Sequence, residues 1–270
     1  MIVAQITDTH IQRKGRRLFG TVNAASHLRR CVARLNALEP RPDIVIATGD
    51  LADGGRPKEY RRLRDMLDEL RMPVYLIPGN HDDGEALRAA FPHHDYLPRL
   101  DPSIQYVLDE YPVRLIGLDS TEPGRAGGLL DASRLRWLEA RLRERPDVPT
   151  LVFVHHPPFR TGIPQMDALG FEGADAFGAI VARNPQIERV VSGHIHRAMQ
   201  VRWNGTIACT APSTAYQLVL ALREEHPLGL SLEPPGFALH IWDRGGMLTH
   251  IAQVERYEGL VPLHHADRSR

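Results

Sequence analysis

The chain has 270 residues, of which 43% are apolar, and its 33 acidic side chains balance its 33 basic ones. This length and composition suit one large folded domain, or a domain with an appendage, and exclude both a disordered chain and one that binds nucleic acids or anionic membranes through its overall charge. No stretch reaches the roughly 18 apolar residues of a membrane span and no secretory signal is visible, so we expect a soluble, cytoplasmic protein.

The first third of the chain alternates apolar runs with helical patterns. Residues 2–6 and 43–50 are predicted strands, and residues 23–39 between them carry apolar side chains at helical spacing. Residues 57–70 repeat the helical spacing, and residues 73–77 form the next strand. Strands and helices in this order predict βαβ units with parallel strands, and therefore an α/β fold.

The rest of the chain adds strands and then becomes β-rich. In the middle of the chain we predict a loop over residues 92–103, a helix over 131–145, and four strands. The strands are predicted over residues 104–108, 113–118, 150–154 and 189–192. Beyond residue 196 we predict hairpins over 199–210 and 237–255, the first turning at Asn204-Gly205 and the second at Arg244-Gly245-Gly246, with a lid-like loop over 222–236 between them. Two cysteines without metal-site spacing, Cys31 and Cys209, are predicted to be buried free thiols.

Five of the predicted strands end in side chains that can bind a metal ion. The candidates are Asp8, His10, Asp50, Asn80, His155, His194 and His196. Ligands gather at the carboxyl ends of strands in α/β sheets, so these side chains are expected to converge. Each of them alone could equally be a turn residue or a structural histidine, and Asp119 with Ser120 is predicted to be structural, but five such strand ends together favour a metal site.

The candidate ligands are all nitrogen or oxygen donors, a set that suits Mn²⁺, Fe, Co²⁺ or Zn²⁺. Seven ligands are more than one ion needs once a water is counted. Two ions sharing one carboxylate use the set economically, and Asp50, alone on the central strand, is the predicted bridge. Two ions about 3.5 to 4 Å apart can clamp the attacking and leaving oxygens of a phosphoryl displacement.

The same residues resemble the sequence blocks of the calcineurin-like metallophosphoesterases. The blocks occur in order as Asp8-x-His10, Gly49-Asp50, Gly79-Asn80-His81-Asp82, His155-His156-Pro157-Pro158 and Gly193-His194-x-His196. Connecting stretches such as Leu18-Phe19-Gly20 and Tyr75-Leu76-Ile77-Pro78 look most like the bacterial glycerophosphodiesterase and class III cyclic-nucleotide phosphodiesterase subgroup.

This resemblance implies an αββα sandwich of two mixed β-sheets flanked by helices, with a dimetal catalytic core over residues 1–200. Residues 201–270 are expected to complete the sandwich and to form a β-rich cap and an oligomerisation region. One ion is expected to take Asp8, His10, Asp50 and His196, and the other Asp50, Asn80, His155 and His194. A metal-bound hydroxide would then attack phosphorus in line.

Three residues beside the ligands have open roles. The resemblance implies that His81 touches the phosphate and the leaving oxygen, where it can donate a proton; a structural role in fixing Asn80 is the alternative. Asp82 is expected either to orient His81 or to cap the following helix. His156 is expected to support a ligand or to face the pocket, and His155 is preferred as the ligand because it directly follows its strand.

The leading functional hypothesis is a phosphodiesterase acting on a small diester, a glycerophosphodiester or a 3',5'-cyclic nucleotide. A phosphomonoesterase or a phosphohydrolase of broader specificity would use the same metals. A non-catalytic metal-binding scaffold is a third reading, although no ligand position is missing and His81 is present. We expect a small-molecule substrate and a homo-oligomer formed through the C-terminal region, with no nucleic acid polymer and no membrane as partner.

Overall fold

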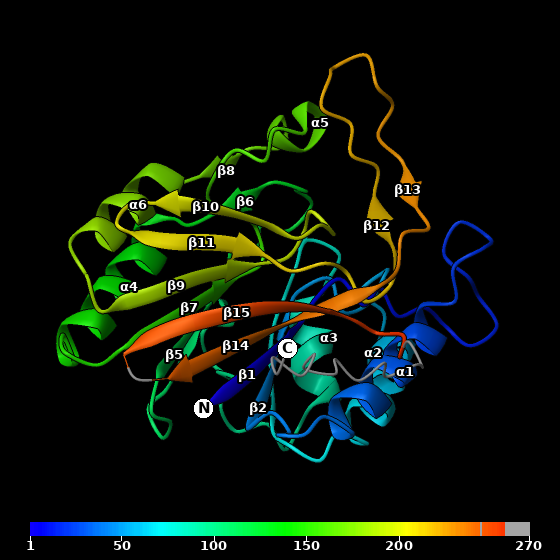
Figure 1. Cartoon of the computed structure of the whole chain (residues 1–270), viewed down its shortest axis with the longest axis horizontal. Helices are drawn as coiled ribbons and strands as arrows, with labels where there is room; N and C mark the ends of the chain where they lie inside the picture. The colour runs from blue at the N-terminus through cyan, green and yellow to red at the C-terminus, as the bar shows by residue number, and fades with distance from the viewer. Residues whose placement is uncertain (244, 257–270) are drawn as a thin grey trace, which may run out of the picture.

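The computed structural model describes residues 1–243 and 245–256, in which two mixed β-sheets are the main feature (Figure 1). The first sheet has the strand order β15-β14-β1-β2-β3. Its strands are β1 (Ile2–Ile6), β2 (Ile44–Thr48), β3 (Val74–Ile77), β14 (Gly236–Asp243) and β15 (Gly246–Gln253). β1, β2 and β3 are parallel, whereas β14 pairs antiparallel with both β1 and β15. The predicted parallel βαβ units at the start of the chain are therefore confirmed.

The second sheet has the strand order β10-β11-β9-β7-β5-β4. Its strands are β4 (Tyr106–Leu108), β5 (Arg114–Leu118), β7 (Thr150–Val154), β9 (Ile187–Ser192), β10 (Met199–Trp203) and β11 (Thr206–Thr210). Two ribbons of two-residue strands complete the set, β6 (Gly128–Leu129) with β8 (Phe171–Glu172) and β12 (Gln217–Leu218) with β13 (Leu230–Ser231). Strands from both sides of residue 200 therefore contribute to each main sheet, and residues 257–270 of the predicted C-terminal segment lie outside the described residues.

Helices cover the outer faces of the two sheets (Figure 1). The first sheet packs against α1 (Ala24–Asn36), α2 (Pro57–Leu67) and α3 (Gly84–Ala90), and the second against α4 (Ala132–Glu144) and α6 (Ala174–Ala182); α5 (Pro164–Asp167) is a single turn. Among the described residues, no helix combines the length and the apolar composition needed to cross a bilayer.

The side chains of β7 show how the layers are separated. Leu151 and Phe153 belong to the core shared with the first sheet, whereas Val152 and Val154 belong to the core under α4 and α6. Successive side chains of a strand point to opposite faces, so a strand buried on both faces reads as a continuous apolar run. The two cores confirm the predicted αββα sandwich.

Most predicted elements are present, but the stretch between β7 and β9 was not predicted. It contains α5 and α6, and α6 begins after Gly173 with no side-chain cap. The helix expected after Asp82 is present as the short α3, which begins after Asp83. The tight turn between β10 and β11 is confirmed, since Asn204 and Gly205 have φ values of 47° and 93°. The second hairpin is present as β14 and β15, but Arg244 of its predicted turn lies outside the described residues.

Buried polar side chains link the two sheets near β14. His240 lies between the side chains of Gln5 and Thr249, at 3.1 and 2.9 Å. Gln5 on β1 also donates to the carbonyl of Ser192 on β9, and Arg189 on β9 donates to the hydroxyl of Thr249. Burial and the nearby charge of Arg189 lower the pKa of His240 to about 3.

We therefore expect His240 to make the fold acid-sensitive. In the unfolded chain a histidine has a pKa of about 6.5, so between about pH 6.5 and pH 3 the unfolded state binds a proton that the folded state does not. As the pH falls through this window, His240 should lower the free energy of unfolding by up to ~1.4 kcal/mol per pH unit. Urea unfolding between pH 4.5 and 6.5 should give a shallower pH dependence for His240→Gln. The exposed His250→Gln is the control, and an unchanged slope in His240→Gln would contradict the assignment.

Candidate metal centre

The candidate ligands lie where parallel strands of both sheets end. Asp8, Asp50 and Asn80 follow β1, β2 and β3 of the first sheet, and His155 and His194 follow β7 and β9 of the second. Hydrogen bonds join these loops across the sandwich, since the backbone N–H of His194 donates to the Asp8 carboxylate at 3.0 Å. The sheet ends therefore face one another and share one cluster of polar side chains.

Four candidates from distant parts of the chain form a first group. Ligand atoms of Asp8, His10, Asp50 and His196 all lie within 4.8 Å of one another, and all four residues are buried. The Nε2 atoms of His10 and His196 are 3.2 Å apart, and Nε2 of His196 lies 3.3 Å from Oδ1 of Asp8. Donor atoms this close in a buried space fit the first coordination shell of one ion.

A second group lies on the other side of the Asp50 carboxylate. Nε2 of His155 is 3.2 Å from Oδ1 of Asn80 and 3.4 Å from Oδ1 of Asp50, and the rings of His155 and His194 are centred 5.1 Å apart. The other Asp50 oxygen, Oδ2, lies 3.7 Å from Nε2 of His10 in the first group. One carboxylate oxygen therefore faces each group, which is the geometry of a bridging ligand.

Two of the histidine rings are fixed by backbone carbonyls. Nδ1 of His155 lies 2.8 Å from the Thr48 carbonyl oxygen, and Nδ1 of His196 lies 2.9 Å from the Tyr216 carbonyl oxygen. A carbonyl oxygen can only accept, so each Nδ1 carries the proton and, in the neutral ring, each Nε2 keeps its lone pair. Metal-binding histidines are commonly oriented in this way.

The charges of the cluster stabilise the ionised carboxylates. Burial raises the pKa of Asp50, but the charges of His155 and His10 outweigh it and hold that pKa well below its usual value. Burial likewise raises the pKa of Asp8, and the adjacent His196 more than offsets it. For His155, burial lowers the pKa, but Asp50 raises it to about 9. Two buried carboxylates therefore remain charged and need positive charge beside them.

Backbone strain is concentrated at the candidate ligands. Within the described part of the chain, seven residues other than glycine have φ values in the left-handed region, and five of them are Asp8, His10, Asp50, His194 and His196, with φ between 41° and 70°. Such conformations cost free energy for residues with a Cβ and are typically retained at functional sites.

The glycines of the motifs have no room for a side chain. A Cβ on Gly79 would lie 2.3 Å from the backbone nitrogen of Asp50, and one on Gly193 would lie 2.0 Å from Oγ1 of Thr7. Gly49 has a φ of +92°, and a Cβ there would lie 2.3 Å from the His155 ring. These glycines let the strand ends approach closely enough to bring the candidate ligands together.

His81 lies at the open side of the cluster. Its side chain is 41% exposed, its Nδ1 lies 2.8 Å from the Asp53 carbonyl oxygen, and its Nε2 lies 3.9 Å from Oδ2 of Asp50. Burial lowers the pKa of His81, but the charge of Asp50 and the carbonyl of Asp53 more than offset this effect, so the pKa is raised. The ring is therefore oriented with its Nε2 toward a molecule that enters the site.

Asp82 makes neither of the two contacts expected from the sequence. Its carboxylate accepts hydrogen bonds from the backbone N–H groups of Leu51, Ala52 and Gly79, and from the Tyr60 hydroxyl. The helix that follows is capped by the next residue, whose side chain accepts from the backbone of Ala86. Asp82 thus holds the loops after β2 and β3 together, because backbone donors of both loops bind its carboxylate. No sequence pattern predicted these contacts.

His156 lies beside the second group and lines a pocket. Its Nδ1 is 2.7 Å from the Ser120 hydroxyl, and its Nε2 is buried without a hydrogen-bond partner, as is Nδ1 of His194. Ligand atoms of His155, His156 and His194 lie within 4.8 Å of one another. Buried polar atoms are rarely left unpaired, so these free nitrogens support the presence of an ion or a bound molecule in this part of the structure.

Several residues that shape the site were not found in the sequence. The ring of Tyr216 packs on His10 and His196 at centroid distances of 5.6 and 4.4 Å. The Ser213 hydroxyl donates to the carbonyl of Asp8, and Oδ1 of Asp53 lies 3.5 Å from Nδ1 of His10. Of these residues, Asp53 could have been suspected from the sequence, because it is a carboxylate three positions after Asp50. Nothing in the sequence around Tyr216 indicated a role.

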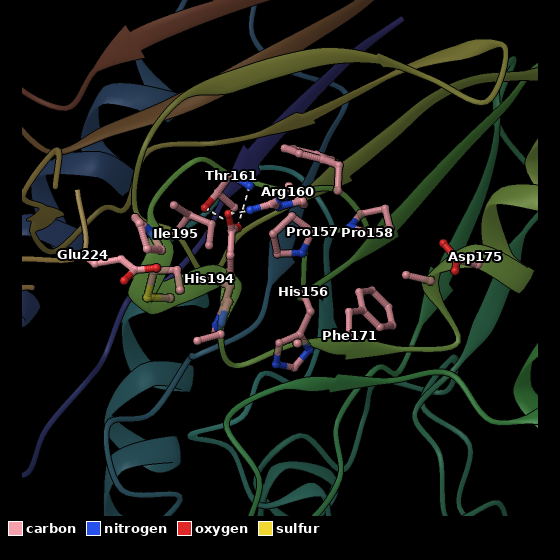
Figure 2. A pocket seen from close by; sticks show the side chains of 17 residues that line it. His156, Pro157, Pro158, Arg160, Thr161, Phe171, Asp175, His194, Ile195 and Glu224 are labelled. Carbon is pink, nitrogen blue, oxygen red and sulfur yellow. Dashed lines mark hydrogen bonds and ion pairs between the residues drawn. The ribbon is translucent and has the colours of Figure 1, made fainter. Parts of the chain in front are cut away.

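A pocket of about 530 Å³ opens beside His156 and His194, and Figure 2 shows its lining side chains. Phe159, Met166 and Phe171 give it apolar surface. Its charged side chains are Arg160, Asp167, Asp175 and Glu224. Gln165 donates to the carbonyl of His226, which holds the loop that carries Glu224 over the pocket. The pocket therefore offers space for an organic group next to the cluster of candidate ligands.

The donor set fits metal ions. It consists of imidazole nitrogens, carboxylate oxygens and one amide, in two groups that share a carboxylate. The unpaired buried nitrogens and the ionised carboxylates are the environment that a divalent cation would complete. Two facing sheets with such a cluster at their strand ends are the arrangement of a metal-dependent phosphoesterase.

Comparison with known proteins identifies the family. Residues 1–198 match the family model described as calcineurin-like phosphoesterase. A probable glycerophosphodiester phosphodiesterase of Arcobacter nitrofigilis is 36% identical over 266 residues, which cover 98% of this chain and 97% of the relative. A probable cyclic nucleotide phosphodiesterase of Synechococcus is 36% identical over 244 residues, 87% and 88% of the two chains. The chain belongs to the calcineurin-like phosphoesterase family.

A solved structure confirms the fold independently of close sequence similarity. A dimetal phosphatase from Danio rerio superposes with a TM-score of 0.67 at 17% identity, covering 94% of this chain and 96% of the other. The family match confirms the family that the sequence motifs predicted, and this likeness confirms the fold class.

Proposed function

We propose that this protein is a two-metal phosphodiesterase that hydrolyses small phosphodiesters, either glycerophosphodiesters or 3',5'-cyclic nucleotides. The observation that carries the proposal is the position of Asp50, whose two carboxylate oxygens face two separate groups of donor side chains. Relatives that match over most of their length are named for these two substrate classes.

The proposed ligands divide between the two groups. One ion would be held by Asp8, His10, Asp50 and His196, and the other by Asp50, Asn80, His155 and His194. When bound, Mn²⁺, Fe, Co²⁺ or Zn²⁺ would supply Lewis-acid stabilisation of the phosphate and lower the pKa of a coordinated water. The chain contributes donors that are already oriented, because the Nδ1 atoms of His155 and His196 are held by backbone carbonyls.

His81 is the proposed proton donor to the leaving oxygen. Its Nδ1 is engaged by the Asp53 carbonyl, so the ring is oriented while Nε2 stays free on the open side of the cluster. Protonation of an alkoxide as it leaves contributes typically 10²- to 10⁴-fold to a rate. The pocket beside His156 is the proposed site for one organic group of the diester, since its volume of about 530 Å³ is in the range of small-molecule sites.

A comparison of two model esters tests the proposed function. The metal-loaded protein is expected to hydrolyse bis-p-nitrophenyl phosphate with a higher kcat/KM than p-nitrophenyl phosphate. A clear preference for the monoester would make it a phosphomonoesterase instead. Metal analysis that finds no tightly bound transition metal, together with no hydrolysis after Mn²⁺ or Co²⁺ is added, would favour a non-catalytic scaffold.

The proposal includes a homo-oligomer formed through the C-terminal segment, residues 201–270, which would also cap the pocket. Large apolar side chains are exposed there, with Leu220 at 55%, Leu222 at 57% and Leu232 at 78%. Light scattering that finds a monomer would refute the oligomer. A cytoplasmic location is also proposed; both cysteines, Cys31 and Cys209, are buried and free.

A further inference from the structure

A second cavity, of about 980 Å³, lies outside the metal centre, and none of its lining residues is a candidate ligand. It is formed by the loop after β1, by α1 and by α2. We call it the basic groove, because seven basic side chains line it against one acidic side chain, Asp65. Lys14 and Lys58, the two lysines of the whole chain, are both among them.

The positive charge of the basic groove is not neutralised within the described part of the chain. Asp65 forms its ion pair with Arg64, which does not line the groove. Other arginines have acidic partners, as Arg30 does with Glu255 at 2.7 Å. Burial and the charge of Arg29 both lower the pKa of Arg62, as expected where like charges lie close together. Uncompensated like charges oppose folding, and a bound anion would relieve their repulsion.

The lining of the groove indicates what kind of anion it suits. It consists of charged side chains and one glycine, with no aromatic ring on which a nucleic-acid base could stack. Arginine forks bind phosphate oxygens in pairs, and lysine adds point charges. The volume is within the usual range of small-molecule sites. We propose that the basic groove binds a small anion that carries several phosphate groups and is recognised through those phosphates alone.

One lining residue of the basic groove, Arg62, also contacts the loop that leads into the metal centre. Arg62 donates to the carbonyl of Gln12 at 2.7 Å, and the Gln12 side chain donates to Oδ2 of Asp53 at 2.9 Å. A substitution of Arg62 would therefore disturb the loop as well as the groove. Arg13, Lys14 and Arg61 are exposed and make no such contact in the described structure, so they are the better residues to change.

Calorimetric titration of the metal-loaded protein with inorganic tripolyphosphate tests the proposal. The groove variant Arg13→Gln/Lys14→Gln/Arg61→Gln is expected to bind tripolyphosphate on the order of tenfold more weakly than the parent, from the loss of three surface charge pairs. The matched control, Arg41→Gln/Arg136→Gln/Arg202→Gln, removes the same charge from exposed positions elsewhere and should bind like the parent. Tripolyphosphate should chelate metal and bind at the metal centre equally in all three proteins. A difference in affinity between the groove variant and the other two therefore comes from the basic groove.

Three results would overturn the proposal. The first is equal affinity in the parent and the groove variant, which would assign the binding to the metal centre. The second is an equal loss in both triple variants, which would assign it to overall charge. The third is a single-stranded DNA oligonucleotide that binds more tightly than tripolyphosphate and loses affinity in the groove variant, which would make the surface a nucleic-acid site.

Discussion

Asp50→Ala is expected to abolish hydrolysis and to loosen both metal ions. Oδ1 of Asp50 faces His155, and Oδ2 faces His10. Removal of the carboxylate would take one ligand from each ion and would leave two cations without the negative charge between them. Loss of a two-metal clamp removes several kcal/mol of transition-state stabilisation, so the rate should fall by ~10³-fold or more. Metal content after dialysis and the rate with bis-p-nitrophenyl phosphate measure the two effects separately.

Asp119→Ala is the matched control for Asp50→Ala. Asp119 is also a buried aspartate that follows a strand, but its carboxylate accepts from the backbone of Ile104 and Thr121 and lies in no ligand group. We expect this variant to be less stable but to keep its metal and its hydrolytic rate. If Asp50→Ala retained both ions while Asp119→Ala lost them, the bridging assignment would be wrong.

The sequence was sufficient for the parts of the fold that depend on local patterns. β7 could be predicted because four of its five buried residues form a continuous apolar run, and the β10–β11 turn because Asn204-Gly205 readily adopts positive φ. α6 could not be predicted, since its start at Gly173 has no side-chain cap. A short apolar helix without a polar face or a cap gives no periodic signal.

The candidate ligands could be predicted, but the groups that orient them could not. Asp8 and His10 are two positions apart, so an extended strand end predicts that they share a face; they do converge, but through left-handed backbone, with φ of 51° and 41°. The carbonyl of Tyr216, which holds His196, belongs to a residue twenty positions away, and every residue has a carbonyl. The left-handed backbone of Asp50 and His194 is likewise invisible in the sequence, because neither is a glycine. These features depend on tertiary packing.

Asp82 shows why neighbours in the sequence were misleading. Its position next to His81 suggested contact with that ring, whereas its carboxylate accepts from the backbone of Leu51 and Ala52 in the loop after β2. The role of holding two loops together is determined by which N–H groups the fold leaves without partners. Asp82 therefore has a structural role in the motif, whereas His81 lies on the open side of the cluster.

His81→Ala is expected to keep both ions and to lose rate. The ring is 41% exposed and its Nε2 lies 3.9 Å from the nearest Asp50 oxygen, so the proposed coordination does not require it. Loss of a general acid should cost about 10²- to 10⁴-fold with a diester of an alkyl alcohol. The loss should be smaller with bis-p-nitrophenyl phosphate, because p-nitrophenol leaves readily as its anion. Steady-state rates with both diesters, measured beside metal content, provide the comparison.

The dependence on the leaving group separates proton donation from a structural role. A histidine that merely fixed Asn80 would, when removed, weaken metal binding and reduce the rate equally for both diesters. A proton donor affects only the substrate whose leaving oxygen needs the proton, because its contribution is made in the transition state. The exposed His93→Ala is the control for removal of an imidazole and should match the parent with both substrates. Equal losses on the two diesters, or lost metal, would therefore assign His81 to the support of Asn80.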